Sequence, residues 1–164
     1  MIRIGLISDT HSHLEESVFK YFGECDEIWH AGDIGDIKVL EKLEAFKPVR
    51  AVFGNIDGND IRIAAPEDQI FEIEGLKVWI THIGGYPPKY TNRIKKKLDE
   101  IKPGLFICGH SHILKVMPDR ERNLVHMNPG AAGKVGFHKM KTLLRFSINN
   151  DKLSDLEVIE LGRK

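Results

Sequence analysis

The stretch Leu105-Phe106-Ile107-Cys108-Gly109-His110-Ser111-His112 places two histidines directly after a short apolar run. Such a run is typical of a buried strand, which would leave both imidazoles at the strand's carboxyl end. A divalent metal ion is the usual reason to hold imidazoles there, although an H-x-H pair on a turn can also be a surface or structural pair. This stretch alone leaves the two interpretations open.

Four further polar clusters follow strand-like runs elsewhere in the chain. They are Asp9-Thr10-His11, Gly32-Asp33, Gly54-Asn55-Ile56-Asp57 and Thr81-His82. The runs at 2–7, 27–31 and 49–53 alternate with helical spacing at 14–22, where Ser12 is the expected N-cap, and at 39–46, which Pro48 closes. Strand, helix, strand repeated in this way implies parallel strands, and ligands bind beyond the carboxyl ends of parallel strands.

The second half of the chain predicts a hairpin, one more helix and four further strands. Strands at 69–73 and 76–81 meet at Glu74-Gly75, and a helix is expected at 90–101. The remaining strands are expected at 105–108, 124–127, 143–148 and 153–161. Nine or so strands and three helices suit two sheets packed face to face with helices outside, within a single domain spanning 1–164.

Composition narrows the classes of partner. Basic and acidic residues number 24 each, so the net charge is zero and nothing predicts a surface for long nucleic acids or a membrane. The two cysteines, Cys25 and Cys108, are not a spaced pair, which fits a reducing, cytoplasmic setting. No run approaches 18 apolar residues, so we expect neither a signal peptide nor a membrane span.

The polar clusters supply carboxylate, imidazole and amide donors without a thiolate. This donor set suits hard to borderline divalent ions such as Mn, Fe, Co, Ni or Zn. Seven such ligands are too many for one tetrahedral ion, but they suit two ions sharing a bridging carboxylate. Water between two such ions can lose its proton near pH 7 instead of near about 15.7, which makes it a nucleophile. The chain offers no G-x-S-x-G elbow, and residues 130–135 lack the phosphate-loop pattern.

The five motifs together resemble, in order and spacing, the calcineurin-like metallophosphoesterase superfamily. They are D-T-H at Asp9, A-G-D at Asp33, G-N-x-D at Asn55, T-H at His82, and G-H-S-H at His110 and His112. The short length and the segment Asn128-Pro129-Gly130 are similar to the small YfcE-type phosphodiesterase branch. The resemblance implies an α/β fold, namely a four-layer αββα sandwich of two mixed β-sheets flanked by helices.

The resemblance also implies two divalent ions, for which Mn is the first expectation and Ni, Co, Fe, Zn or Mg are alternatives. The first ion would be held by Asp9, His11 and His112. The second would be held by Asn55, His82 and His110, and Asp33 would bridge the two. Asn55 is counted among the catalytic residues as well as among the ligands.

Two positions depart from the family pattern. Many superfamily phosphatases have a histidine in the third motif that protonates the leaving oxygen, and this chain has Ile56 there. His13 could supply the proton instead, although a surface or supporting role is commoner for such a histidine. Asp57 is expected to support its turn. His30 either supports a ligand or is structural.

Gly84 is the second departure, because many relatives have a histidine two residues after the T-H motif. The pocket wall must therefore differ there, and Tyr86 and Pro87-Pro88 are the candidates. His126 and His138 have no motif around them and are interpreted as structural or surface residues. Trp29 and Trp79 lie within strands, which favours core packing.

The expected activity is that of a dinuclear-metal-dependent phosphodiesterase that hydrolyses small diesters by attack of a metal-bridging hydroxide. The formal charges of two divalent ions, Asp9, Asp33, a hydroxide and a diester cancel, whereas a monoester dianion would leave the site negative. The alternatives are a phosphomonoesterase or nuclease of the same chemistry and a non-catalytic scaffold resembling the small retromer subunit. The expected partner is a small phosphodiester, and relatives suggest a homodimer or homotetramer.

Overall fold

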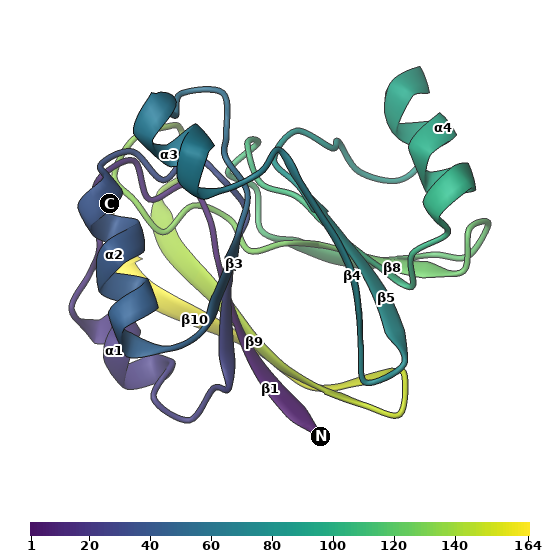
Figure 1. Cartoon of the computed structure of the whole chain (residues 1–164), viewed down its shortest axis with the longest axis horizontal. Coiled ribbons are helices and arrows are strands. Elements are labelled where there is room, and N and C mark those ends of the chain that lie inside the picture. The colour runs from purple at the N-terminus through teal and green to yellow at the C-terminus, as the bar shows by residue number, and fades with distance from the viewer.

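The computed structural model describes residues 1–164 as two five-stranded sheets that pack face to face, with helices on both outer faces (Figure 1). The first sheet has the order β10-β9-β1-β2-β3. Its strands are β1 (Ile2–Ile7), β2 (Glu27–His30), β3 (Val49–Ala51), β9 (Met140–Asn149) and β10 (Lys152–Arg163). β1, β2 and β3 run parallel, as the strand-helix-strand repeat predicts, so their carboxyl ends share one edge.

The second sheet has the order β4-β5-β6-β8-β7. Its strands are β4 (Asp68–Ile73), β5 (Leu76–Thr81), β6 (Leu105–Ile107), β7 (Lys115–Asp119) and β8 (Leu124–Asn128). β5, β6 and β8 are parallel, while β4 and β7 are antiparallel edge strands. Both sheets are therefore mixed, which confirms the expected fold class.

Four helices complete the outer layers. Figure 1 shows α1 (Ser17–Tyr21), α2 (Ile37–Phe46) and α3 (Asn59–Ala64) beside the first sheet and α4 (Asn92–Ile101) on the opposite side of the molecule. Asp36 caps the N-terminus of α2, because its carboxylate accepts a hydrogen bond from Lys38 N. None of the four helices combines the length and the apolar character that crossing a bilayer requires.

Strand alternation divides the core into three layers. Ile4 and Leu6 of β1 point between the sheets, whereas Ile7 packs with residues of α1 and α2. In the second sheet Trp79 turns toward α4. Trp29, between the sheets, and Trp79 are both fully buried, which confirms their predicted place in the core.

Two elements are absent from the sequence prediction. α3 buries only Ile61, so it has no apolar repeat for a pattern to detect. β7 contains Pro118, which argues against a strand in general but is tolerated on an edge. The assignment of Ser12 as an N-cap is wrong: α1 begins only at Ser17, and the Ser12 hydroxyl instead accepts a hydrogen bond from Asp36 N at 2.9 Å.

The buried His126 of β8 makes the stability of the folded protein depend on pH. Its side chain is buried against Phe106 and Tyr90, and burial lowers its pKa to about 4, with Lys115 acting in the same direction and Asp119 against it. The folded protein therefore binds fewer protons than the unfolded chain between about pH 6.5 and pH 4. Stability contributed by the neutral imidazole is lost as the pH falls through this window.

We expect His126→Leu to reduce the difference in unfolding free energy between pH 7.5 and pH 4.5 by up to about 3 kcal/mol. Urea unfolding of both proteins at the two pH values measures this difference. Glu44→Gln, at an exposed residue that forms no ion pair, serves as the control. An unchanged pH dependence in His126→Leu would contradict the argument.

Candidate metal centre

The polar clusters of both sheets meet where the parallel strands end. Asp9 and His11 follow β1, Asp33 follows β2, and Asn55 follows β3 in the first sheet. His82 follows β5 in the second sheet, and His110 and His112 follow β6. Residues up to about a hundred positions apart in the chain are thereby joined directly: His110 N donates a hydrogen bond to Asp9 Oδ2 at 3.1 Å.

The charged and imidazole donors form two groups. Asp9, His11 and His112 make one, and Asp33, His82 and His110 make the other; within each group one ligand atom from every residue lies within 4.8 Å of the others. Asn55 Oδ1 lies 3.1 Å from His110 Nδ1 and so borders the second group. The structure thus brings together all seven residues that the sequence assigns to metal binding.

Asp33 lies between the two groups. Its Oδ2 is 3.3 Å from His11 Nε2 in the first group and 3.2 Å from His82 Nε2 in the second. Asp9 faces the first group more closely, because its Oδ1 is 3.2 Å from His112 Nε2 and 3.8 Å from His82 Nε2. Asp33 therefore faces an imidazole of each ligand group at 3.2 to 3.3 Å.

Three donor atoms at the centre are buried without a hydrogen-bond partner: Asp9 Oδ1, His11 Nε2 and His82 Nε2. An unpaired polar atom inside a protein costs about 1–3 kcal/mol, and more when it is charged. Carboxylate oxygen and neutral imidazole nitrogen are ligands for borderline divalent ions, and one ion can satisfy several such atoms at once. The residues present therefore fit divalent metal ions.

In Asp9, Asp33 and His82 the side-chain atom that faces away from the centre is held by the protein. Asp9 Oδ2 accepts from the Ser8 hydroxyl at 2.7 Å, and Asp33 Oδ1 accepts from Ile56 N at 3.1 Å. His82 Nδ1 donates to the carbonyl of Ala31 at 2.7 Å, which leaves the lone pair on Nε2. Each residue consequently presents one free atom to the shared space.

The ligand backbones are strained. Asp9, His11, Asp33, His110 and His112 all adopt the left-handed region, with φ between 45° and 69°. Such residues cost about 1–3 kcal/mol each and cluster at functional sites.

Two glycines allow the motif turns to approach the carboxylates. A Cβ on Gly109 would lie 2.7 Å from Asp9 Oδ2, and a Cβ on Gly54 would lie 2.0 Å from Asp33 Oδ1. A side chain at either position would displace the carboxylate that the turn has to hold, which explains the glycine before His110 and the glycine before Asn55.

The side chains perturb one another's pKa values. Burial would raise the pKa of Asp33, but its contact with His82 and the Ile56 amide lower it overall. Burial would lower the pKa of His82, but Asp33 and Asp9 raise it overall. Burial lowers the pKa of His110, and the charge of His82 acts in the same direction. The centre is thus an anionic, proton-binding cavity in which metal ions and protons compete.

Asp57 and His30 hold the ligand loops. The Asp57 carboxylate accepts hydrogen bonds from three backbone amides, those of Ile34, Gly35 and Gly54, at 2.8 to 3.1 Å. It therefore ties the loop after β2 to the loop after β3.

His30 is fully buried, and burial lowers its pKa to about 4. Its Nδ1 accepts from Gly32 N at 3.1 Å, and its Nε2 donates to the Thr10 hydroxyl, also at 3.1 Å. The hydroxyl in turn donates to Ile34 O at 2.9 Å, so the neutral ring joins the loops that carry His11 and Asp33.

His13 belongs to neither ligand group. Its Nε2 donates to Glu15 Oε1 at 3.0 Å, and Lys141 Nζ contacts the same carboxylate. These two hydrogen bonds lower the pKa of Glu15 to about 2. The proton-donor role of His13 stays a prediction.

Sequence reasoning missed two supporting residues. Asn128 Nδ2 donates to Gly109 O at 3.0 Å, which fixes the turn before His110. The ring of His138 packs edge-on against that of His112, with 5.2 Å between their centroids, although His138 was interpreted as structural or surface. The Asn128-Pro129-Gly130 segment was a signal for the first, but the sequence around His138 offered none.

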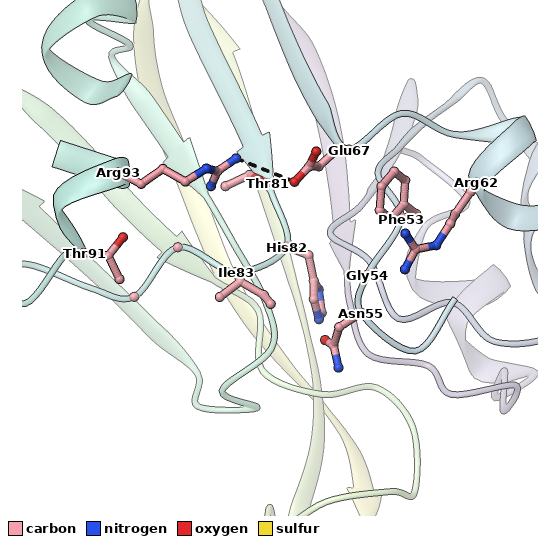
Figure 2. A pocket seen from close by; sticks show the side chains of 12 residues that line it. Phe53, Gly54, Asn55, Arg62, Glu67, Thr81, His82, Ile83, Thr91 and Arg93 are labelled. Atoms are coloured by element: carbon pink, nitrogen blue, oxygen red, sulfur yellow. Dashed lines mark ion pairs between the residues drawn. The ribbon is translucent and has the colours of Figure 1, made fainter. Parts of the chain in front are cut away.

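A pocket of about 440 Å³ adjoins the centre. Asn55 and His82 line it together with Ile83, Gly84 and Gly85 (Figure 2). Tyr86 and Pro87-Pro88, the expected wall residues, do not line this pocket. Tyr86 instead lines a separate small hollow with Ser111 and Asn128, where Lys115 Nζ lies 4.1 Å from its ring centroid. A Cβ on Gly84 would lie 2.6 Å from the Phe106 ring, which leaves no room for a histidine there.

Comparison with known proteins shows the family to which this chain belongs. The model of the calcineurin-like phosphoesterase superfamily domain matches residues 2–151. A probable metallophosphoesterase of Methanothermobacter thermautotrophicus is 33% identical, over 97% of this chain and 92% of that protein. A phosphodiesterase of Methanocaldococcus jannaschii is 29% identical, over 79% of this chain and 83% of that protein.

Solved structures include the same fold. Wild-type Vps29 from Entamoeba histolytica, complexed with Zn²⁺, superposes with a TM-score of 0.74 over 98% of this chain and 99% of that one. The two are 16% identical in sequence, so the likeness concerns the fold alone.

The unpartnered donor atoms predict that metal binding stabilises the protein. At a free Mn²⁺ concentration about a hundred times the Kd, one site adds about 2.7 kcal/mol, which raises Tm by roughly 5–10 °C. Asp33→Asn removes a carboxylate charge that faces both ligand groups, so we expect the Tm of the variant to rise much less with Mn²⁺ than that of the parent.

Thermal scans of chelator-treated protein with and without Mn²⁺ measure this response. Asp99→Asn, a surface change remote from the centre, is the control and should respond as the parent does. An equal metal response in Asp33→Asn would argue against the site.

Proposed function

Since this chain belongs to the calcineurin-like phosphoesterase superfamily, we propose that it is a metal-dependent phosphodiesterase that hydrolyses small phosphodiesters. The observation that carries the proposal is the convergence of buried, unpartnered donor atoms from both sheets at one edge, where Asp33 faces both ligand groups. The relative from M. jannaschii that is named a phosphodiesterase supports the same reaction.

Two divalent ions are proposed, with Mn²⁺ first among the candidates. Asp9, His11 and His112 would hold one ion and Asn55, His82 and His110 the other, with Asp33 shared between them. Bound ions would supply Lewis acidity at the phosphate and a water that loses its proton near neutral pH. The protein orients these ligands by anchoring the second oxygen of Asp9 and Asp33.

The preference for diesters rests on charge. Two divalent ions, the two buried carboxylates and a hydroxide together carry one net positive charge. One negative charge on the substrate balances this better than two. No arginine or lysine forms an ion pair with Asp9 or Asp33, so the charge of both carboxylates remains available to bound ions. The neutral net charge of the chain further supports small substrates over long nucleic acids.

Leaving-group protonation is the weak part of the site. Ile56 occupies the position at which many relatives have a histidine, and it is 47% exposed. We propose that His13 supplies the proton where the leaving group needs one, which requires its ring to turn away from Glu15. Diesters with good leaving groups would then be the best substrates.

The proposed setting is the cytoplasm, since Cys25 and Cys108 are both free and buried. A homodimer or homotetramer is proposed from relatives alone. The non-catalytic alternative shares the fold seen in Vps29, but the complete set of seven ligands argues for catalysis here.

We expect Mn²⁺ to restore hydrolysis of bis(4-nitrophenyl) phosphate to chelator-treated protein, with little turnover of 4-nitrophenyl phosphate. Asp33→Asn and His112→Ala should lose at least about a hundredfold in kcat because each removes a ligand atom that no neighbour replaces. Release of nitrophenolate measures both substrates, and Ni, Co, Fe, Mg and Zn are tested in turn.

Asp99→Asn should retain full activity in the same assay. Faster turnover of the monoester would overturn the diester assignment, and metal binding without any turnover would favour the scaffold alternative.

His13→Gln tests the proton donor. We expect it to slow a diester with phenol as the leaving group about tenfold or more, while bis(4-nitrophenyl) phosphate, whose leaving group needs little protonation, changes less. Comparison of kcat for the two diesters in parent and variant measures the effect. Equal losses for both would contradict the role of His13.

A further inference from the structure

The pocket beside the metal centre carries two arginines that the proposed reaction does not use. Arg62 comes from α3 and Arg93 from the first turn of α4, so the two outer helical layers each contribute one (Figure 2). In Figure 2 the two side chains lie on opposite sides of the hollow, with His82 and Asn55 between them. Since His82 and Asn55 belong to the ligand set, the pocket opens directly onto the metal centre.

Arg62 presents an unpaired charge to this pocket. Its Nε donates to the Asp57 backbone carbonyl at 2.8 Å, and its guanidinium lies over the Phe53 ring at 4.4 Å. Neither contact neutralises the charge, and Arg62 forms no ion pair with a carboxylate. These two contacts fix the orientation of the group and leave its terminal nitrogens free to bind an anion.

Arg93 can leave its present ion pair and bind an anion at little cost in free energy. Its only ion pair is with Glu67, at 3.6 Å, and both side chains are more than half exposed. Exposed pairs of this kind contribute about 0–1 kcal/mol, so Arg93 can exchange Glu67 for an anionic ligand. With Glu67 as the one carboxylate lining the pocket, its lining has an excess of one positive charge in a chain whose net charge is zero.

We infer that this pocket binds an anionic group on the substrate, a carboxylate or a phosphate, in addition to the phosphate that is cleaved. The inference rests on the proposed function, because the metal centre would hold the scissile phosphate and the arms of the diester would extend from it. A volume of about 440 Å³ is within the usual range for small-ligand pockets, about 300–1,000 Å³. Arg62 is the main determinant of this specificity, and Arg93 is the second.

The test uses two diesters of nearly the same shape, the charged bis(4-carboxyphenyl) phosphate and the neutral-armed bis(4-carbamoylphenyl) phosphate, and compares the ratio of their kcat/KM values between variant and parent. Their arms are identical within each molecule, so the result does not depend on which arm enters the pocket. We expect Arg62→Gln to lower kcat/KM for the dicarboxylate about tenfold, mainly through KM, and to change the value for the diamide much less. Arg93→Gln should act in the same direction with a smaller effect.

Three controls separate charge from structure. Arg62→Lys keeps a positive charge and should retain part of the preference. Arg120→Gln changes the net charge equally, at an exposed residue outside the pocket, and should leave the ratio of the two kcat/KM values unchanged. Glu67→Gln frees Arg93 and should raise the preference for the dicarboxylate.

The outcomes distinguish this inference from the proposed function. Hydrolysis of both diesters with an unchanged ratio in Arg62→Gln and Arg93→Gln would overturn the inference and leave the phosphodiesterase standing. If the metal-loaded protein hydrolyses neither diester, their Kd values from calorimetry give the same comparison: a loss of dicarboxylate binding in Arg62→Gln supports the pocket assignment, and equal binding overturns it. A diester with phosphonates in place of the carboxylates identifies which anion the pocket prefers.

Discussion

The structure depends on holding two buried carboxylates, Asp9 and Asp33, beside each other at the edge shared by both sheets. In each carboxylate one oxygen accepts hydrogen bonds from the protein and the other faces imidazole nitrogens. Burying two negative charges in this way is unfavourable unless positive charge joins them. The close turns at Gly54 and Gly109 and the left-handed ligand backbones all follow from this requirement.

The sequence predicts best what buried parallel strands dictate. β1 and β5 occur at the predicted residues because both are largely apolar runs, each interrupted by one basic residue, with polar residues directly after them. For the same reason the ligand positions are predictable, since the carboxyl ends of parallel strands share an edge. Elements that bury little, such as α3 and β7, leave no such pattern. The pocket walls could therefore not be predicted from the sequence, because Arg62 lines the pocket through its position on α3.

The same fold can serve a protein with or without catalysis, so function here rests on the side chains at the edge. The strain in the ligand loops bears on this point. Five ligands in the left-handed region, together with unpartnered donor atoms, make the metal-free centre costly. A protein that binds no metal gains nothing from that cost, whereas bound ions would offset it and find their ligands preorganised.

In the third motif, the contacts that hold the carboxylates do not involve the side chain at position 56. Asp33 is anchored by the backbone amide of Ile56, and Asp57 anchors the neighbouring turn through three backbone amides, so neither contact depends on the side chain at position 56. A histidine can therefore be exchanged for isoleucine there without disturbing the bridging carboxylate. What changes is the range of leaving groups, and the chemistry then depends on how firmly the substrate is held. Arg62 and Arg93 line the adjoining pocket, so under the proposed function recognition of the substrate's arms would compensate for the general acid that position 56 does not supply.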